Sequence, residues 1–244
     1  MHISRILIIV AIIVVIFNFY LQKTNVEYKK QIITIKDIID GDTVKTKNES
    51  IRLVGINTPE KNMPNWKLSK NYLKRLIGKN VFLVWFDKKY DRYKRRLGYI
   101  FYNKTNINKK LVELGYGHTY YVSKDPLTEE LKNAENTAIK KESGIWKKSN
   151  KSKCMIMNIF PKKEYVVITN DCNFSINTCG WTLKDEATHI FYFPCLNLTK
   201  TITVYSKNEN KAKWSFNKKY VWNNDNDKAF LRDKTGRLIT YKSI

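Results

Sequence analysis

The sequence contains no C-x-x-C pair, although it has four cysteines at positions 154, 172, 179 and 195. Structural zinc sites commonly use cysteine pairs at that spacing, so we do not expect one here. In an exported protein an even number of cysteines permits disulfides, and four cysteines can pair in three ways. Four free buried thiols agree equally well with the sequence.

Acidic residues are scarce, with 22 Asp and Glu against 45 Lys and Arg and a formal net charge of +23. Such an excess favours polyanionic partners. A composition rich in lysine, asparagine and isoleucine, as an AT-rich genome produces, explains the total charge equally well. The excess is spread over the whole chain, so charge alone identifies no binding face. The histidines are few, and we interpret neither His118 nor His189 as a ligand or base.

The amino terminus has no charged residue between Ile6 and Phe17. This run is shorter than the roughly 20 residues that span a bilayer and is typical of a signal-peptide core. No small-x-small cleavage site follows it. We therefore predict that residues 1–22 are a signal peptide or membrane anchor, and that the protein is secreted or membrane-anchored, facing outside the cytoplasm. A buried core helix is the alternative interpretation.

Short β-branched runs separated by turn residues predict a mainly β first half with helices. The third of its helices has the clearest signals, with Asp125 as cap, Pro126 in the first turn and an apolar stripe that includes Leu131 and Ala138. The order of elements fits a five-stranded OB-fold barrel carrying about three helices. The predicted strands cover residues 32–39, 43–47, 51–56, 81–86 and 97–102, and the helices run from Asn65 to Gly78, from 107 to 114, and from Asp125 to Gly144.

The second half shows no helical pattern and no internal repeat of the first. Its short strands, separated by turn residues, predict a β-sandwich over residues 157–244. The polar stretch at 149–156 is the predicted linker. The predicted strands cover residues 165–169, 180–183, 189–193, 201–205, 219–222, 229–232 and 238–241.

Polar residues stand at the ends of two neighbouring strands of the first half. Asp42 and the Asn57–Thr58 pair offer a carboxylate, an amide oxygen and a backbone carbonyl, which are ligands suited to a hard cation such as Ca²⁺. Glu60 follows a proline and is placed to hold a water beside the metal. The planar guanidinium of Arg52 suits bidentate contact with phosphate. Together these groups predict metal-assisted attack on a phosphodiester.

This part of the chain, about residues 30–148, resembles the staphylococcal nuclease (thermonuclease) family. The resemblance implies a calcium-dependent nuclease acting on DNA or RNA. Its implied calcium ligands are Asp42, Asn57 and the Thr58 carbonyl, with Glu60 as the general base. Arg52 and Arg95 would stabilise the transition state, and Arg92, Tyr93 and Tyr121 would line the nucleotide pocket. The matching segments are residues 40–43, 52–60, 91–95, 97–99, 108, 111–112, 115–116 and 144–146.

Three positions depart from the family pattern. Asn57 replaces the usual aspartate and removes one negative charge, so we expect weaker calcium binding. Lys94 stands where the family usually has glycine, which predicts a differently shaped loop. Ser123 replaces a second pocket tyrosine. These departures motivate an alternative function, a non-catalytic nucleic-acid-binding or envelope-surface interaction protein that retains the nuclease fold.

The second half resembles the lamin-tail domain, which implies an immunoglobulin-like sandwich without catalytic residues. The resemblance lies in residues 167–170, 180–185, 191–194, 222–224, 227–231 and 233–236. We expect Trp181 and Trp222 in the core, and Asp225, Asp227 and Asp233 in turns. Its partner is unknown from the sequence, and a membrane contact is expected only through the amino-terminal segment.

Overall fold

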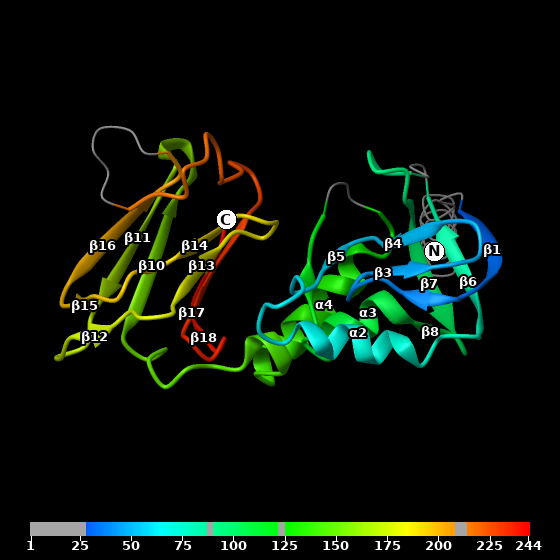
Figure 1. Ribbon diagram of the computed structural model, residues 1–244, viewed down its shortest axis with the longest axis horizontal. Coiled ribbons are helices and arrows are strands. Elements are labelled where there is room, and N and C mark those ends of the chain that lie inside the picture. Colours follow the sequence, from blue (N-terminus) through cyan, green and yellow to red (C-terminus); the bar gives the residue numbers. More distant parts are fainter. Residues whose placement is uncertain (1–27, 87–89, 122–124, 208–213) are drawn as a thin grey trace, which may run out of the picture.

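The computed structural model describes residues 28–86, 90–121, 125–207 and 214–244. The chain forms two domains that lie side by side along its longest axis (Figure 1). The predicted signal or anchor at 1–22 and the departure at Ser123 lie outside the described residues. Within the described ranges, no helix has the length and apolar character needed to cross a bilayer.

One sheet dominates the first domain. Its two end strands, β1 and β2, are separated by only two residues, so the sheet curls until its ends meet. No ladder joins these ends in the described part of the chain, so the sheet is not a closed barrel, although the mainly β class is confirmed. The strand order is β1 (Lys29–Thr34), β6 (Asn80–Trp85), β7 (Arg96–Tyr102), β4 (Ser50–Leu53), β3 (Thr43–Lys45) and β2 (Asp37–Ile38), with β8 (Thr105–Asn106) on β7 and a separate pair β5 (Ile56–Asn57) and β9 (His118–Thr119).

The three predicted helices are present as α2 (Trp66–Lys74), α3 (Ile107–Glu113) and α4 (Thr128–Lys140), below the sheet in Figure 1. α2 ends at Lys74, four residues before the predicted end at Gly78, and Ile77 beyond it is 44% exposed. α4 begins later than predicted, because Asp125 accepts from the Leu127 N–H and closes the turn before the helix. Gly144 opens the short 3₁₀ turn η1 (Gly144–Trp146) beyond the helix.

The second domain packs its sheets around Trp181 and Trp222, which are both buried as predicted. The strand predicted at 219–222 is wrong, because the N–H groups of Val221 and Trp222 donate to the Glu164 carboxylate instead of to a strand. The first sheet is β14 (Ile190–Tyr192), β13 (Thr182–Lys184), β17 (Lys228–Arg232) and β18 (Leu238–Ser243); the second is β10 (Met155–Phe160), β11 (Tyr165–Asn170) and β16 (Thr201–Tyr205), beside the pair β12 (Ile176–Asn177) and β15 (Asn197–Leu198).

The cysteines form two disulfides, Cys154–Cys172 and Cys179–Cys195, so the alternative of free thiols is wrong. The connecting segment is held rather than free, since the Ser149 N–H donates to the Leu238 carbonyl of β18. Strand β10 begins at Met155, inside the predicted linker.

The domains meet at a buried boundary of apolar and charged side chains. Trp146 and Phe230, from opposite domains, lie with ring centroids 5.8 Å apart in a small apolar cluster. Beside it, the Lys228 ammonium lies 3.0 Å from the Glu135 carboxylate of α4. It also donates to the Thr119 carbonyl at 2.8 Å. The lamin-tail-like domain is therefore packed directly against the end of the first domain that carries β9 and α4.

Candidate active site

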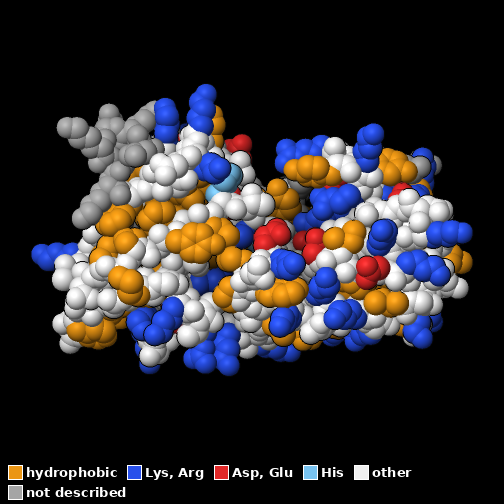
Figure 2. Space-filling view, viewed as in Figure 1, with side chains coloured by type: hydrophobic (Ala, Val, Ile, Leu, Met, Phe, Trp, Pro, Cys, Tyr) orange, Lys and Arg blue, Asp and Glu red, His pale blue; other side chains and the backbone are white. Residues whose placement is uncertain are grey.

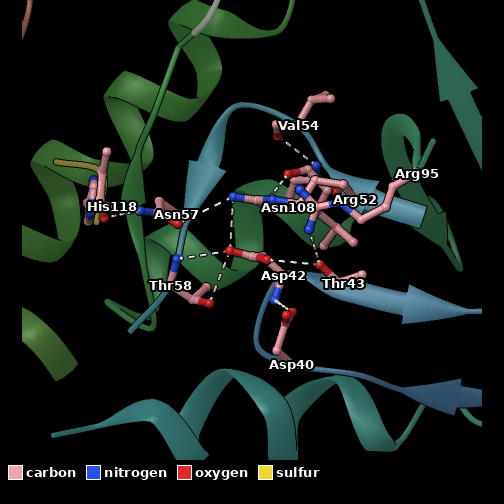
Figure 3. A network of polar contacts seen from close by, with 12 residues as sticks. Asp40, Asp42, Thr43, Arg52, Val54, Asn57, Thr58, Arg95, Asn108 and His118 are labelled. Atoms are coloured by element: carbon pink, nitrogen blue, oxygen red, sulfur yellow. Dashed lines mark hydrogen bonds and ion pairs between the residues drawn. The ribbon is translucent and has the colours of Figure 1, made fainter. Parts of the chain in front are cut away.

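Strand pairing brings together Arg52 and the residues predicted to bind the metal. β3 and β4 pair with Thr43 opposite Arg52, and Asp42 immediately precedes β3. The Leu53 N–H donates to the Asp42 carbonyl at 2.8 Å, which fixes Asp42 beside the end of β4. Asn57 ends β5, the next strand along the chain. Figure 3 shows these side chains facing one another from the ends of their strands.

Gly41 allows the turn before Asp42 to lie close to the chain after β5. A Cβ at this position would lie 2.4 Å from the Thr58 hydroxyl and 2.1 Å from the Ser69 hydroxyl, closer than real contacts allow. With glycine there, Asp42 Oδ2 accepts from both the N–H and the hydroxyl of Thr58, at 3.2 and 3.3 Å. The Asp-Gly-Asp-Thr segment therefore requires glycine for a steric reason.

Two oxygens converge on a single point. Arg52 Nη2 lies 3.1 Å from Asp42 Oδ2 and 3.3 Å from Asn57 Oδ1. Both oxygens therefore face the same guanidinium nitrogen. They are a carboxylate and an amide oxygen, the ligand types that calcium accepts. In the described ranges no three His, Cys, Asp or Glu side chains gather as metal ligands, so any calcium bound here needs amide and backbone oxygens as well.

Asp42 is buried between a cation, Arg52, and a second acid, Asp40. Burial raises the pKa of its carboxyl to about 6; Arg52 opposes this rise and the nearby Asp40 carboxylate adds to it. Asp40 also accepts from the Asp42 N–H at 3.1 Å. A divalent cation at this point would remove the repulsion between the two acids. The charge balance therefore fits calcium, while the role of the Thr58 carbonyl stays a prediction.

Arg95 reaches the same strand end from the loop before β7. Its Nε lies 2.7 Å from Asp91 Oδ2, and its Nη1 donates to the Thr43 hydroxyl at 3.5 Å. Asp91 also accepts from the Tyr93 and Arg95 N–H groups, which closes the loop. Lys94 has a φ of 60°, the left-handed conformation that glycine adopts without strain. Both predicted arginines therefore lie beside Asp42 and Thr43.

The remaining predicted residues are Glu60, Arg92, Tyr93 and Tyr121. Glu60 is exposed. Its carboxylate is near enough to Lys184 of the second domain to oppose the effect of burial, which lowers the pKa of Lys184. Arg92 stacks over the exposed Tyr93 ring with its guanidinium 4.8 Å from the centroid.

Tyr121 contacts α4 rather than the loop before β7 that carries Tyr93. Its hydroxyl donates to the Thr128 carbonyl at 3.2 Å, and burial raises its pKa. Tyr121 lines a groove at the domain boundary together with Glu135, Glu186 and Lys228. The structure therefore gathers Asp42, Arg52, Asn57, Thr58 and Arg95. Tyr93 lies beside this group, with the Arg95 guanidinium 5.4 Å from its ring centroid, whereas Tyr121 lies apart at the domain boundary.

Sequence reasoning missed the contribution of the second domain. The loop between β13 and β14, residues 185–189, lies against Asn57, whose Nδ2 donates to the carbonyls of Glu186 at 2.9 Å and Ala187 at 3.3 Å. Lys184 donates to the same Ala187 carbonyl. Some 129 positions separate Asn57 from Glu186, so no local pattern signalled this contact.

Acidic side chains of both domains meet at this boundary. Figure 2 shows Asp and Glu side chains clustered between the two halves of the molecule, with Lys and Arg around them. Burial, with the neighbouring Asp227 carboxylate, raises the pKa of Glu186 to about 7. The edge of the candidate site is therefore less basic than the net charge of the chain suggests.

The fold and site define a nuclease-type OB domain joined to an immunoglobulin-like sandwich, and comparisons with known proteins agree. The family described as staphylococcal nuclease homologue matches residues 50–148, and the lamin tail domain matches residues 147–243. A thermonuclease of Staphylococcus intermedius is 28% identical over 156 residues, 57% of this chain and 93% of that protein.

Two further relatives extend the comparison. An uncharacterized endonuclease of Haemophilus influenzae is 34% identical over 129 residues, 50% of this chain and 70% of that protein. An uncharacterized protein of Bacillus anthracis is 37% identical over 124 residues, which are 45% of this chain and 58% of that protein's length. The chain belongs to the staphylococcal nuclease family and carries a lamin-tail domain after its nuclease domain.

Proposed function

We propose that the protein is a calcium-dependent nuclease that hydrolyses phosphodiester bonds in DNA or RNA. The observation that carries the proposal is the convergence of the Asp42 and Asn57 oxygens on one point, with two arginines beside it. A buried carboxylate with a raised pKa, next to a second acid, supports a cation at that point. Relatives named thermonuclease and endonuclease support the reaction class.

In this proposal Asp42, Asn57 and the Thr58 carbonyl hold calcium, which neutralises charge on the phosphate when bound. Glu60 is exposed, so water reaches its carboxylate, which accepts the proton as that water attacks phosphorus. The bond from phosphorus to the 5′ oxygen breaks, and the leaving oxygen takes a proton from solvent, which gives a 3′-phosphate and a 5′-hydroxyl. Arg52 and Arg95 stabilise the negative charge that gathers on the phosphate oxygens. Arg92, Tyr93 and Tyr121 bind the nucleotide.

The test is cleavage of plasmid and single-stranded DNA and of RNA by the purified protein, first with calcium and then with a chelator. Removing a general base typically lowers the rate by about 10²- to 10⁴-fold, and we expect this of Glu60→Gln. Arg95→Ala should also lower the rate strongly, because it removes a charge-stabilising donor.

Glu113→Gln is the matched control, since Glu113 lies on α3 and forms an ion pair with Lys110 of the same helix. It should cleave like the unaltered protein. Unchanged cleavage in both Glu60→Gln and Arg95→Ala would refute the proposed roles.

A second candidate is a nucleic-acid-binding protein without turnover. It is favoured by the ion pair of Arg52 with Asp42, which already supplies a positive charge at the metal point, and by the neutral Asn57. This candidate predicts DNA binding that weakens steeply with salt and does not depend on calcium. Calcium-dependent turnover would exclude it.

We also propose that the protein acts outside the cytoplasm, either secreted or held at the membrane by its amino-terminal segment. Two disulfides support this, because such bonds persist mainly in oxidising compartments. Cell fractionation with thiol labelling tests it. Recovery of the protein in the cytoplasm with four reactive thiols would contradict it.

A further inference from the structure

The amide of Asn57 is the point at which the two domains share the candidate site. Its Oδ1 faces Arg52, and its Nδ2 faces the carbonyls of Glu186 and Ala187. A guanidinium can only donate hydrogen bonds and a carbonyl can only accept them. The amide therefore has one satisfied orientation, with its oxygen on the Asp42 side.

The loop 185–189, together with Lys184 at the end of β13, is called the 184–189 hairpin below. We propose that this hairpin of the lamin-tail domain is a positioning element of the nuclease site, which orients Asn57 so that its oxygen faces the metal point. This inference rests on the proposed function. It assigns to the second domain a part in metal binding, because an amide has only one oxygen to offer. If the amide turned over, its NH₂ group would face the cation instead.

The hairpin is held in place from its own domain. Lys184 donates to the Asp185 carbonyl at 3.1 Å and also to the Ala187 carbonyl. Asp185 accepts from the His189 N–H at 2.9 Å, and Asp227 accepts from the Glu186 N–H at 3.3 Å. The carbonyls that face Asn57 therefore belong to a braced loop, as a positioning role requires.

The hairpin also gives a physical reason for asparagine at this position. An aspartate in the same place would set a carboxylate oxygen against the Glu186 and Ala187 carbonyl oxygens, with no proton between them. Conversely, a carboxylate has two equivalent oxygens and needs no partner to choose which one faces the cation. Asn57 and the hairpin thus form a matched pair, and an aspartate would make the hairpin unnecessary.

The experiment is a double-mutant cycle in the full chain. One change replaces residues 185–189 by an Asn-Gly turn, which suits the paired ends of β13 and β14; the other is Asn57→Asp. Calcium affinity is measured by calorimetry for all four proteins. We expect the short turn to weaken binding about tenfold when residue 57 is asparagine, the usual effect of losing a group that orients a ligand. With aspartate at position 57 the loss should be below about twofold.

Two further variants guard against a folding artefact. Lys184→Met removes the hydrogen bonds of Lys184 to the Asp185 and Ala187 carbonyls without shortening the chain. It should weaken calcium binding when residue 57 is asparagine, though less than the short turn does. Lys200→Met, on an exposed turn of the same domain, should leave calcium affinity unchanged. An equal loss with asparagine and with aspartate at position 57 would show a merely structural role and overturn the inference. No loss when position 57 is asparagine would overturn it as well.

A calcium-free measurement separates this inference from the proposed function. In protein labelled with ¹⁵N-asparagine, the Asn57 side-chain amide should exchange its protons slowly, and this protection should disappear in the short-turn variant. If the unaltered protein binds no calcium, the proposed function fails, and amide protection still decides whether the hairpin orients Asn57. An Asn57 amide that exchanges equally fast in both proteins overturns the orientation.

Discussion

The two domains differ in where they bury charge. The nuclease domain buries Asp42 at the strand ends of the candidate site and Arg96 on β7, and it also buries Glu135 at the junction. In the lamin-tail domain the core is apolar, and the buried charges Asp185, Glu186, Asp227 and Lys228 lie near the nuclease domain. The charged side chains that the described part of the second domain buries therefore lie at the junction.

The cost of burying charge explains this arrangement. A buried ion needs a partner of opposite charge and full hydrogen bonding. Lys228 finds both in the other domain, where the Glu135 carboxylate and the Thr119 carbonyl and hydroxyl lie within 3.1 Å of its ammonium. We therefore expect substitutions at the junction to lower the stability of both domains together. Substitutions inside one domain should lower the stability of that domain alone.

The largest effect should come from Lys228→Met. It leaves the Glu135 carboxylate buried without its cation, which typically costs about 3–5 kcal/mol of unfolding free energy. Denaturant unfolding, monitored separately in each domain, should show the loss in both. The double variant Lys228→Met with Glu135→Gln should recover most of the stability. A loss confined to the lamin-tail domain would contradict the view of the junction as a shared structure.

Neighbouring residues of β17 provide the next test. Phe230 faces Trp146 of the nuclease domain, whereas Leu231 faces the core of its own domain. Both are at most 2% exposed, so each truncation to alanine should cost about 2–5 kcal/mol. Phe230→Ala should uncouple the unfolding of the two domains, and Leu231→Ala should lower stability without uncoupling them. Identical unfolding curves for the two variants would remove the distinction.

Loss of a disulfide should act within one domain. Replacing Cys179 and Cys195 by alanine opens a loop of 16 residues and should lower the stability of the lamin-tail domain by about 3 kcal/mol. Both residues lie away from the junction contacts described above, so calcium affinity should change little at temperatures where the domain stays folded. A strong drop in calcium affinity under those conditions would place this loop within the junction.

The smallest effect concerns pH. The pKa of Asp42 is raised to about 6, so the folded protein holds this proton more tightly than the unfolded chain. The contribution of Asp42 to stability is therefore greatest below about pH 4 and is lost as the pH rises through 6. Calcium requires the ionised carboxylate, so its affinity should fall about tenfold per pH unit below about pH 6.

Titration calorimetry between about pH 4.5 and 8 measures this dependence. Asp42→Asn should remove the pH dependence of stability over this window that arises from the group, and it should weaken calcium binding at every pH. A calcium affinity that stays constant over the whole window would show that Asp42 is not a ligand.

Patterns local in sequence predicted most elements and several site residues. Alternating β-branched runs located most strands, and capping and apolar periodicity located the three helices. The strand predicted at 219–222 failed because the Glu164 carboxylate, distant in sequence, takes its N–H groups. Cysteine pairing stayed open for the same kind of reason, since spacing alone does not say which sulfurs come together.

By itself, the sequence identified the residue types of the candidate site. Residue types at two strand ends fixed a carboxylate, an amide and a guanidinium as its parts, because neighbouring strands bring their ends together. Only the tertiary structure decided which way the Asn57 amide faces and which domain controls it. That outcome depends on two carbonyls 129 and 130 positions away, and hydrogen bonds over such distances exist only once both domains have folded and packed.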